Sequence, residues 1–109
     1  MRNNSIEWAA GLFEGEGSIY MNTVNGGKSS YPRIAIAMTD EDVIRRFGEV
    51  VGITHYTLRK DNTPNRKPAW EWRTGVREEV IRILSMMLPY FGNRRAYKAL
   101  NILDTLELT

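Results

Sequence analysis

The sequence predicts an α+β fold with the element order αββαββα, in which a four-stranded antiparallel sheet is backed by helices. Two observations carry this prediction. Apolar residues recur every three to four positions in some segments and every second position in others, the periods of helices and strands. Clusters of glycine, asparagine and proline separate the segments, and no segment has the composition of a linker. The 109 residues therefore predict one domain, residues 1–109, with one face of its sheet open.

The first half of the chain predicts a helix followed by a hairpin. Ser5 has the side chain of an N-cap, and the helix that it starts ends at Gly17. Alternation of period 2 predicts a first strand over residues 18–24 and a second from about Pro32 to Met38. The glycines and asparagine of residues 25–27 predict the turn between them.

The second half repeats this alternation and adds a final helix. The expected elements are a helix over residues 40–51 that Gly52 ends, strands over 55–59 and 69–74, a helix over 77–88 that Pro89 ends, and a last helix from about Arg94. Strand parity turns Trp70, Trp72 and Thr74 toward one face, and we expect both tryptophans in the core. The last helix is expected to direct Ala96, Leu100, Leu103 and Leu106 inward.

Composition excludes several classes of chemistry. Without cysteine the chain forms no disulfide and no thiolate metal site, and its one histidine, His55, cannot complete a zinc site that needs two. The first seven residues carry charge where a signal peptide has an apolar core, and no apolar run approaches the roughly 20 residues of a membrane span. We therefore expect an intracellular protein, neither secreted nor in a membrane, that uses carboxylates and basic residues.

The predicted open face of the sheet is rich in arginine. Eleven of the fifteen basic residues are arginines, whose planar fork suits phosphates and guanine edges. Strand parity assigns to this face Ser18, Tyr20, Asn22, Arg33, His55, Thr57, Arg59, Glu71 and Arg73. Arg66 and Lys67, in the loop before the last strand, could reach a DNA backbone. Such groups suit readout of a DNA groove, but an ordinary solvated sheet face has a similar composition, so both interpretations stay open.

The first helix carries two interior glycines. Gly11 and Gly15 lie one turn apart and expose a flat stripe of backbone, which suits the close approach of a second helix. Glu14 and Glu16 stand at its C-terminal end, where acids oppose the helix dipole and no Lys or Arg is near in sequence. A metal or a partner would supply the compensating charge. A glycine-rich helix stop followed by exposed acids is the alternative interpretation.

The segment from Ala9 to Gly17, Ala-Ala-Gly-Leu-Phe-Glu-Gly-Glu-Gly, resembles the signature of the LAGLIDADG homing endonucleases. The departures are Ala9 for leucine, Phe13 for isoleucine, and Glu14 and Glu16 for the two aspartates. The predicted element order is the fold of that family, and residues 88–95 are similar to the family's segment before its last helix. The resemblance covers essentially the whole chain.

The resemblance implies a set of roles for individual residues. Glu16 matches the acid that binds the catalytic divalent ion, which is Mg²⁺ or Mn²⁺, while Glu14 matches an acid that more often supports the helix end. Asp40 falls near a polar active-site position, and Arg94 or Arg95 matches a basic one; Arg94 is our choice. The interface between two subunits would be built from Trp8, Gly11, Leu12 and Gly15. No small-molecule cofactor is implied.

By this resemblance the chain is expected to be a homodimeric, site-specific homing endonuclease of the intron, intein or free-standing type, with intron homing as the associated process, that hydrolyses phosphodiester bonds of double-stranded DNA. One motif per chain supplies half a site, so a homodimer with a near-palindromic target is expected. A catalytically inactive DNA- or RNA-binding module of the same fold, a maturase or regulator, is the alternative. A small α+β dimer that uses its open face for protein contacts is the third interpretation.

Overall fold

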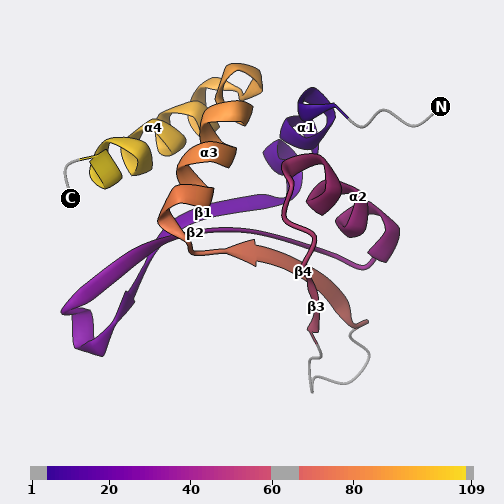
Figure 1. Ribbon diagram of the computed structural model, residues 1–109, viewed down its shortest axis with the longest axis horizontal. Coiled ribbons are helices and arrows are strands. Elements are labelled where there is room, and N and C mark those ends of the chain that lie inside the picture. The colour runs from indigo at the N-terminus through magenta and orange to yellow at the C-terminus, as the bar shows by residue number, and fades with distance from the viewer. Residues whose placement is uncertain (1–4, 60–66, 108–109) are drawn as a thin grey trace.

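The computed structural model describes residues 5–59 and 67–107. In these residues the helices all lie on one side of a curved antiparallel sheet, and the other side is open (Figure 1). The elements along the chain are α1 (Ile6–Glu16), β1 (Gly17–Val24), β2 (Ser29–Met38), α2 (Glu41–Val51), β3 (Thr57–Arg59), β4 (Ala69–Thr74), α3 (Arg77–Met87) and α4 (Asn93–Glu107). The predicted α+β class and alternation are confirmed, and α4 is the last helix that was expected from about Arg94.

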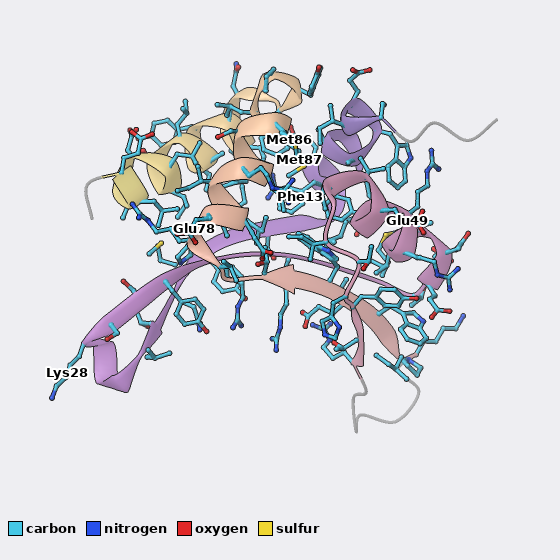
Figure 2. The ribbon with its side chains drawn as sticks, in the orientation of Figure 1. Phe13, Lys28, Glu49, Glu78, Met86 and Met87 are labelled. Carbon is cyan, nitrogen blue, oxygen red and sulfur yellow. The ribbon has the colours of Figure 1, made fainter. Side chains whose placement is uncertain are left out.

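The sheet has the strand order β1-β2-β4-β3, so the two hairpins meet along β2 and β4. All three pairings are antiparallel. The register places Gly17 opposite Ile36 and Ile36 opposite Trp72, which brings the first residue of β1 to the end of β2. The turn of the first hairpin projects from the body of the molecule, with Lys28 at its tip (Figure 2).

The core lies between the sheet and the helices. Trp72 is fully buried; its ring meets Phe47 edge-on at 4.9 Å between centroids, and its indole N–H donates to the Ile53 carbonyl at 2.8 Å. Phe13 of α1 stacks on Phe47 at 6.2 Å. The other buried apolar side chains come from all four helices and from β1 and β2. One continuous core therefore fixes the position of every helix on the sheet.

The ends of the first two helices follow the predicted signals. The Ser5 side chain accepts from the Trp8 N–H at 3.2 Å, as an N-cap does. Gly52 ends α2 at φ +83°, a left-handed conformation that glycine adopts without a steric penalty. No helix in residues 5–59 or 67–107 is long and apolar enough to cross a membrane.

The predicted starts of two strands are wrong. Strand β2 begins at Ser29, three residues earlier than Pro32, because β1 pairs with it as far as the turn. Strand β3 begins at Thr57, so His55 precedes it. Tyr56 is tied to α2 instead, since its hydroxyl donates to Glu41 at 3.1 Å.

The inner faces of α4 and β4 also differ from expectation. Leu100 is exposed, whereas Ala99 and Ile102 are buried beside the correctly predicted Leu103 and Leu106. The stripe of α4 that meets the core is therefore rotated from the one expected. Trp70 is only half-buried, because it packs against the Tyr56 ring on one side and lines an open hollow beside Leu58 on the other.

Candidate nucleic-acid interface and metal site

The open face of the sheet holds the strand residues that parity assigned to it. The register sets Tyr20 opposite Arg33, Ser18 opposite Ala35, which in turn lies opposite Arg73, and Thr57 opposite Glu71. Directly opposed residues share a face. His55 is exposed but stands outside the strands. Polar and charged side chains are therefore gathered on a surface that no helix covers (Figure 2).

A hydrogen-bonded cluster occupies the β1–β2 half of this face. Arg33 donates to the Tyr31 hydroxyl at 2.7 Å, and the Asn22 amide donates to the same oxygen. The neighbouring phenols of Tyr20 and then Tyr31 raise the pKa of Arg33, so its guanidinium stays charged. Sequence reasoning missed Tyr31 because it began the strand at Pro32; extending the alternation back from Arg33 would have found it.

An ion-paired cluster occupies the β3–β4 half. Glu71 lies 3.5 Å from Arg59 and 3.7 Å from Arg73, and its side chain is 17% exposed. The two arginine side chains are 61% and 55% exposed. Both carboxylate oxygens of Glu71 are engaged, one by each arginine.

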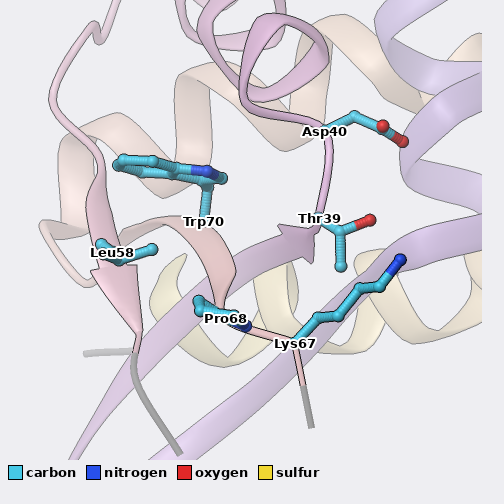
Figure 3. Close-up of a pocket in the computed structure, with 6 residues that line it drawn as sticks. All are labelled: Thr39, Asp40, Leu58, Lys67, Pro68 and Trp70. Carbon is cyan, nitrogen blue, oxygen red and sulfur yellow. The ribbon is translucent and has the colours of Figure 1, made fainter.

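Of the two loop residues predicted to contact a DNA backbone, only one is among the described residues. Arg66 lies outside the described residues. Lys67 is exposed and lines a hollow of about 490 Å³ together with Thr39, Asp40, Leu58, Pro68 and Trp70 (Figure 3). Asp40 stands at the N-cap of α2, but its carboxylate makes no capping hydrogen bond and is exposed.

The C-terminal end of α1 is clamped by the start of α4. The Arg95 guanidinium donates to the carbonyls of Glu14 and Gly17, both at 2.9 Å, and pairs with the Glu14 carboxylate at 3.3 Å. The other Glu14 oxygen accepts from the Gly92 N–H. The charge that compensates Glu14 therefore comes from Arg95, 81 residues away in sequence.

The same contacts distinguish Arg94 from Arg95. The Arg95 side chain is 13% exposed and lies 5.6 Å from the Phe13 ring centroid, so it is part of the framework. Arg94 is exposed, and its side chain makes no hydrogen bond or ion pair with any other described residue. With Gly17, Ser18, Arg95 and Lys98 it lines a second hollow, of about 310 Å³. Lys98, one turn after Arg94, was missed; its spacing of four residues is the signal that could have found it.

Glu16 stands at the edge of this basic hollow. It is the last residue of α1, directly before the Gly17 that lines the hollow, and its side chain is exposed. Gly17 admits no larger residue, because a Cβ there would lie 2.5 Å from the Phe13 ring. Glu16 is thus next in the chain to a residue of the hollow that Arg94 lines, while Asp40 lines the other hollow.

The donor set of Glu16 suits a hard divalent cation that is shared with other ligands. Among the described residues, no three acidic or histidine side chains form a cluster that could hold a metal. Mg²⁺ is commonly bound through one or two carboxylates together with phosphate oxygens and water. One exposed carboxylate fits this pattern if a second chain or a phosphate supplies further oxygens.

The glycine stripe of α1 is open. A Cβ at Gly11 or Gly15 would meet no other atom within 4 Å. Leu12 and Trp8 are half-buried and pack against the core, and Arg46 lies 3.9 Å from the Trp8 ring centroid. Packing within the subunit therefore does not require glycine at these two positions.

The arrangement of these elements is that of the LAGLIDADG homing endonucleases, and the resemblance predicted from the sequence is confirmed for the fold. No family model and no curated protein matches the chain. Solved structures do match. The homing endonuclease I-CvuI, in complex with the I-CreI target in the presence of Mg, has a TM-score of 0.74 and 17% identity over 94% of this chain and 65% of that chain.

Two further structures agree. The archaeal intron-encoded homing endonuclease I-Vdi141I, complexed with DNA, has a TM-score of 0.74 and 19% identity over 94% of this chain and 66% of that chain. The LAGLIDADG homing endonuclease I-GzeII, in complex with its DNA target, has a TM-score of 0.77 and 19% identity over 99% of this chain and 37% of that chain. The chain thus spans slightly less than two-thirds of I-CvuI and I-Vdi141I, and just over a third of I-GzeII.

Proposed function

We propose that this chain is one subunit of a homodimeric, divalent-metal-dependent endonuclease that cuts double-stranded DNA at a specific, near-palindromic site. The observation that carries the proposal is that exposed Glu16 directly precedes Gly17, which lines a hollow together with Arg94 and Lys98 at the start of the arginine-bearing sheet. Structural neighbours that were solved in complex with DNA support it. Because the target would be DNA, an intracellular location is part of this proposal.

The open face would hold the duplex and set its position. Arg33, Arg59 and Arg73 supply donors for base edges and phosphates, and Ser18, Tyr20, Asn22 and Thr57 supply neutral hydrogen-bonding groups. This face would lie against the major groove, where base pairs present distinct patterns of donors and acceptors. Lys67 lies beyond the sheet edge, where it would contact the backbone.

Phosphodiester hydrolysis would take place beside Glu16. Its carboxylate would hold the Mg²⁺ or Mn²⁺ ion, which when bound lowers the pKa of water and stabilises the leaving 3′ oxygen. Arg94 and Lys98 would neutralise the charge that develops on the phosphate during attack. Arg95 acts through the backbone as a positioning residue, since it holds the carbonyls on both sides of Glu16. The exposed carboxylate of Asp40 is proposed to orient water near the cut.

A second copy of the chain would complete the site. The flat backbone at Gly11 and Gly15 allows two α1 helices to approach closely, with Leu12 and Trp8 at the sides of the contact. A two-fold axis through these helices would bring the two Glu16 carboxylates together, and it would impose a near-palindromic target.

One observation favours the alternative of a DNA- or RNA-binding module without catalysis. Within the described residues Glu16 belongs to no acidic cluster, so one subunit alone lacks a preformed metal site. The same fold with an incomplete site would still bind nucleic acid through its open face.

Cleavage selection on a randomised duplex library, with Mg²⁺ and with EDTA in parallel, tests the proposal. We expect cut, near-palindromic sequences with Mg²⁺ alone. Glu16→Gln should lower cleavage at least about 100-fold, since a bound metal contributes several kcal/mol to transition-state stabilisation, while DNA binding stays close to the parent. Retention of duplexes without any cutting would favour the binding module. Equal loss of cutting and binding in Glu16→Gln would refute the assignment of this residue.

A further inference from the structure

Glu71 is the only acidic residue on the open face of the described strands. Its neighbours on that face are Thr57 and Ala37, directly opposite, and Arg73, two positions along β4. A surface that binds a polyanion gains nothing from a carboxylate unless that carboxylate finds a donor of its own. DNA binding by charge alone therefore does not explain why an acidic residue lies at position 71.

Stability does not supply that reason. The ion pairs to Arg59 and Arg73 are 3.5 and 3.7 Å long, and both arginine side chains are more than half exposed. Exposed pairs of this length contribute little to folding, because water and salt screen them. In the free protein Glu71 does, however, hold two flexible arginines in place and partly neutralise them.

We infer that Glu71, placed between Arg59 and Arg73, is a specificity-determining residue that selects G·C base pairs in the DNA target. This inference rests on the proposed function. The Glu71 carboxylate accepts from the N4 amino group of a cytosine, while the flanking arginines donate to guanine O6 and N7. Those are the edges that G·C pairs present in the major groove, where only cytosine and adenine offer an amino donor.

The spacing of the strand agrees with this assignment. Residues 71 and 73 are two positions apart on β4, which is about 6.6–6.8 Å along a strand. Two base-pair steps of B-DNA cover a similar length, since each is about 3.4 Å. Alternate side chains of β4 can therefore address base pairs two steps apart in the same groove.

The cluster also penalises the wrong sequence. On a duplex without cytosine at this place, the carboxylate keeps its two arginines and repels the phosphates. On the matching duplex the carboxylate accepts from the cytosine amino group instead of from the arginines, and both arginines become free to donate to guanine. Discrimination thus comes from a repulsive element as well as an attractive one.

Glu71→Gln tests this inference because glutamine keeps the shape, loses the charge and reads adenine in place of cytosine. Glu49→Gln is the matched control: it removes the same charge from an exposed position on α2, in the helix layer away from the open face (Figure 2). Each protein is used to select binders from a randomised duplex library in EDTA, where no cleavage occurs. Affinity for a mixed-sequence duplex is then measured over a salt series.

In the parent and in Glu49→Gln we expect one G·C position in each half-site that is preferred by about fivefold or more. In Glu71→Gln that position should lose its preference or change to A·T, and mixed-sequence affinity should rise several-fold with a steeper salt dependence. Thermal unfolding should match the parent.

Two other outcomes would overturn the inference, and they are distinguishable. If the parent binds DNA but Glu71→Gln selects the same sequences, Glu71 does not determine specificity and the proposed function survives. If the parent shows no salt-dependent DNA affinity, the proposed function itself fails and this inference fails with it.

Discussion

The two faces of the same sheet divide the molecule between stability and function. On β4 the neighbours Trp72 and Arg73 differ completely: Trp72 is fully buried against Phe47 and Ile53, whereas the Arg73 side chain is 55% exposed beside Glu71. Successive residues of a strand point to opposite faces, so one position decides which role a side chain takes. Substitutions on the inner face should therefore change folding, and substitutions on the open face should change DNA binding alone.

Trp72→Ala should produce the largest effect. It removes the largest buried side chain and leaves the Ile53 carbonyl without its indole donor, so the free energy of unfolding should fall by about 3–5 kcal/mol. Arg73→Ala, one residue away, is the matched control and should leave that free energy within about 0.5 kcal/mol of the parent. Urea denaturation followed by fluorescence or circular dichroism measures both. If both variants lose a similar free energy of unfolding, the two faces do not differ in their contribution to stability.

Arg95→Ala and Arg94→Ala sharpen the comparison at the edge of the sheet. Arg95 clamps the end of α1, so its loss should lower the free energy of unfolding by about 1.5–3 kcal/mol and also slow cleavage. Arg94 has no such contacts, so Arg94→Ala should slow cleavage with an unchanged unfolding curve. Thermal unfolding and cleavage rates of both variants measure these effects. If Arg94→Ala is the destabilised variant, Arg94 has the structural role and Arg95 the catalytic one.

Gly11→Leu tests whether the exposed surface of α1 forms the contact between two subunits. Because a Cβ at Gly11 meets nothing within 4 Å, the subunit should keep its fold and gain about 0.5–1 kcal/mol in helix stability. The leucine should nevertheless separate two α1 helices, giving a monomer with at least about tenfold weaker DNA binding. Analytical ultracentrifugation and DNA titration report the two effects. A stable dimer from Gly11→Leu means that the subunits meet elsewhere.

Arg33→Ala should produce the smallest effect. It removes one half-buried guanidinium and its hydrogen bond to Tyr31, so stability should change by less than about 0.5 kcal/mol. DNA affinity should fall by roughly fivefold or more, and the slope of log affinity against log salt should drop by about one. Arg45→Ala, which removes an arginine from the exposed surface of α2, is the control. A salt slope that does not change excludes a phosphate contact for Arg33.

Local signals predicted most of the fold and much of the site. Every helix and strand was expected. The side chain of Ser5 caps α1 as predicted, and Gly52 ends α2 as its freedom to adopt a positive φ predicted. The open-face residues within the strands are correct because parity is a property of the strand itself. The predictions that were wrong concern packing between elements that are distant in sequence. Leu100 is exposed because α4 packs on the core through Ala99 and Ile102 instead.

The sequence by itself determined the periods of the elements, the position of the nine-residue motif, and the alternation that sets Arg33 and Arg73 on one face of the sheet. These follow from backbone geometry over a few residues. Only the tertiary structure decided that Arg95 clamps Glu14 and leaves Arg94 exposed, and that Glu71 lies between two arginines. These contacts join segments up to 81 residues apart, and their partners are chosen by packing of the whole core rather than by local pattern.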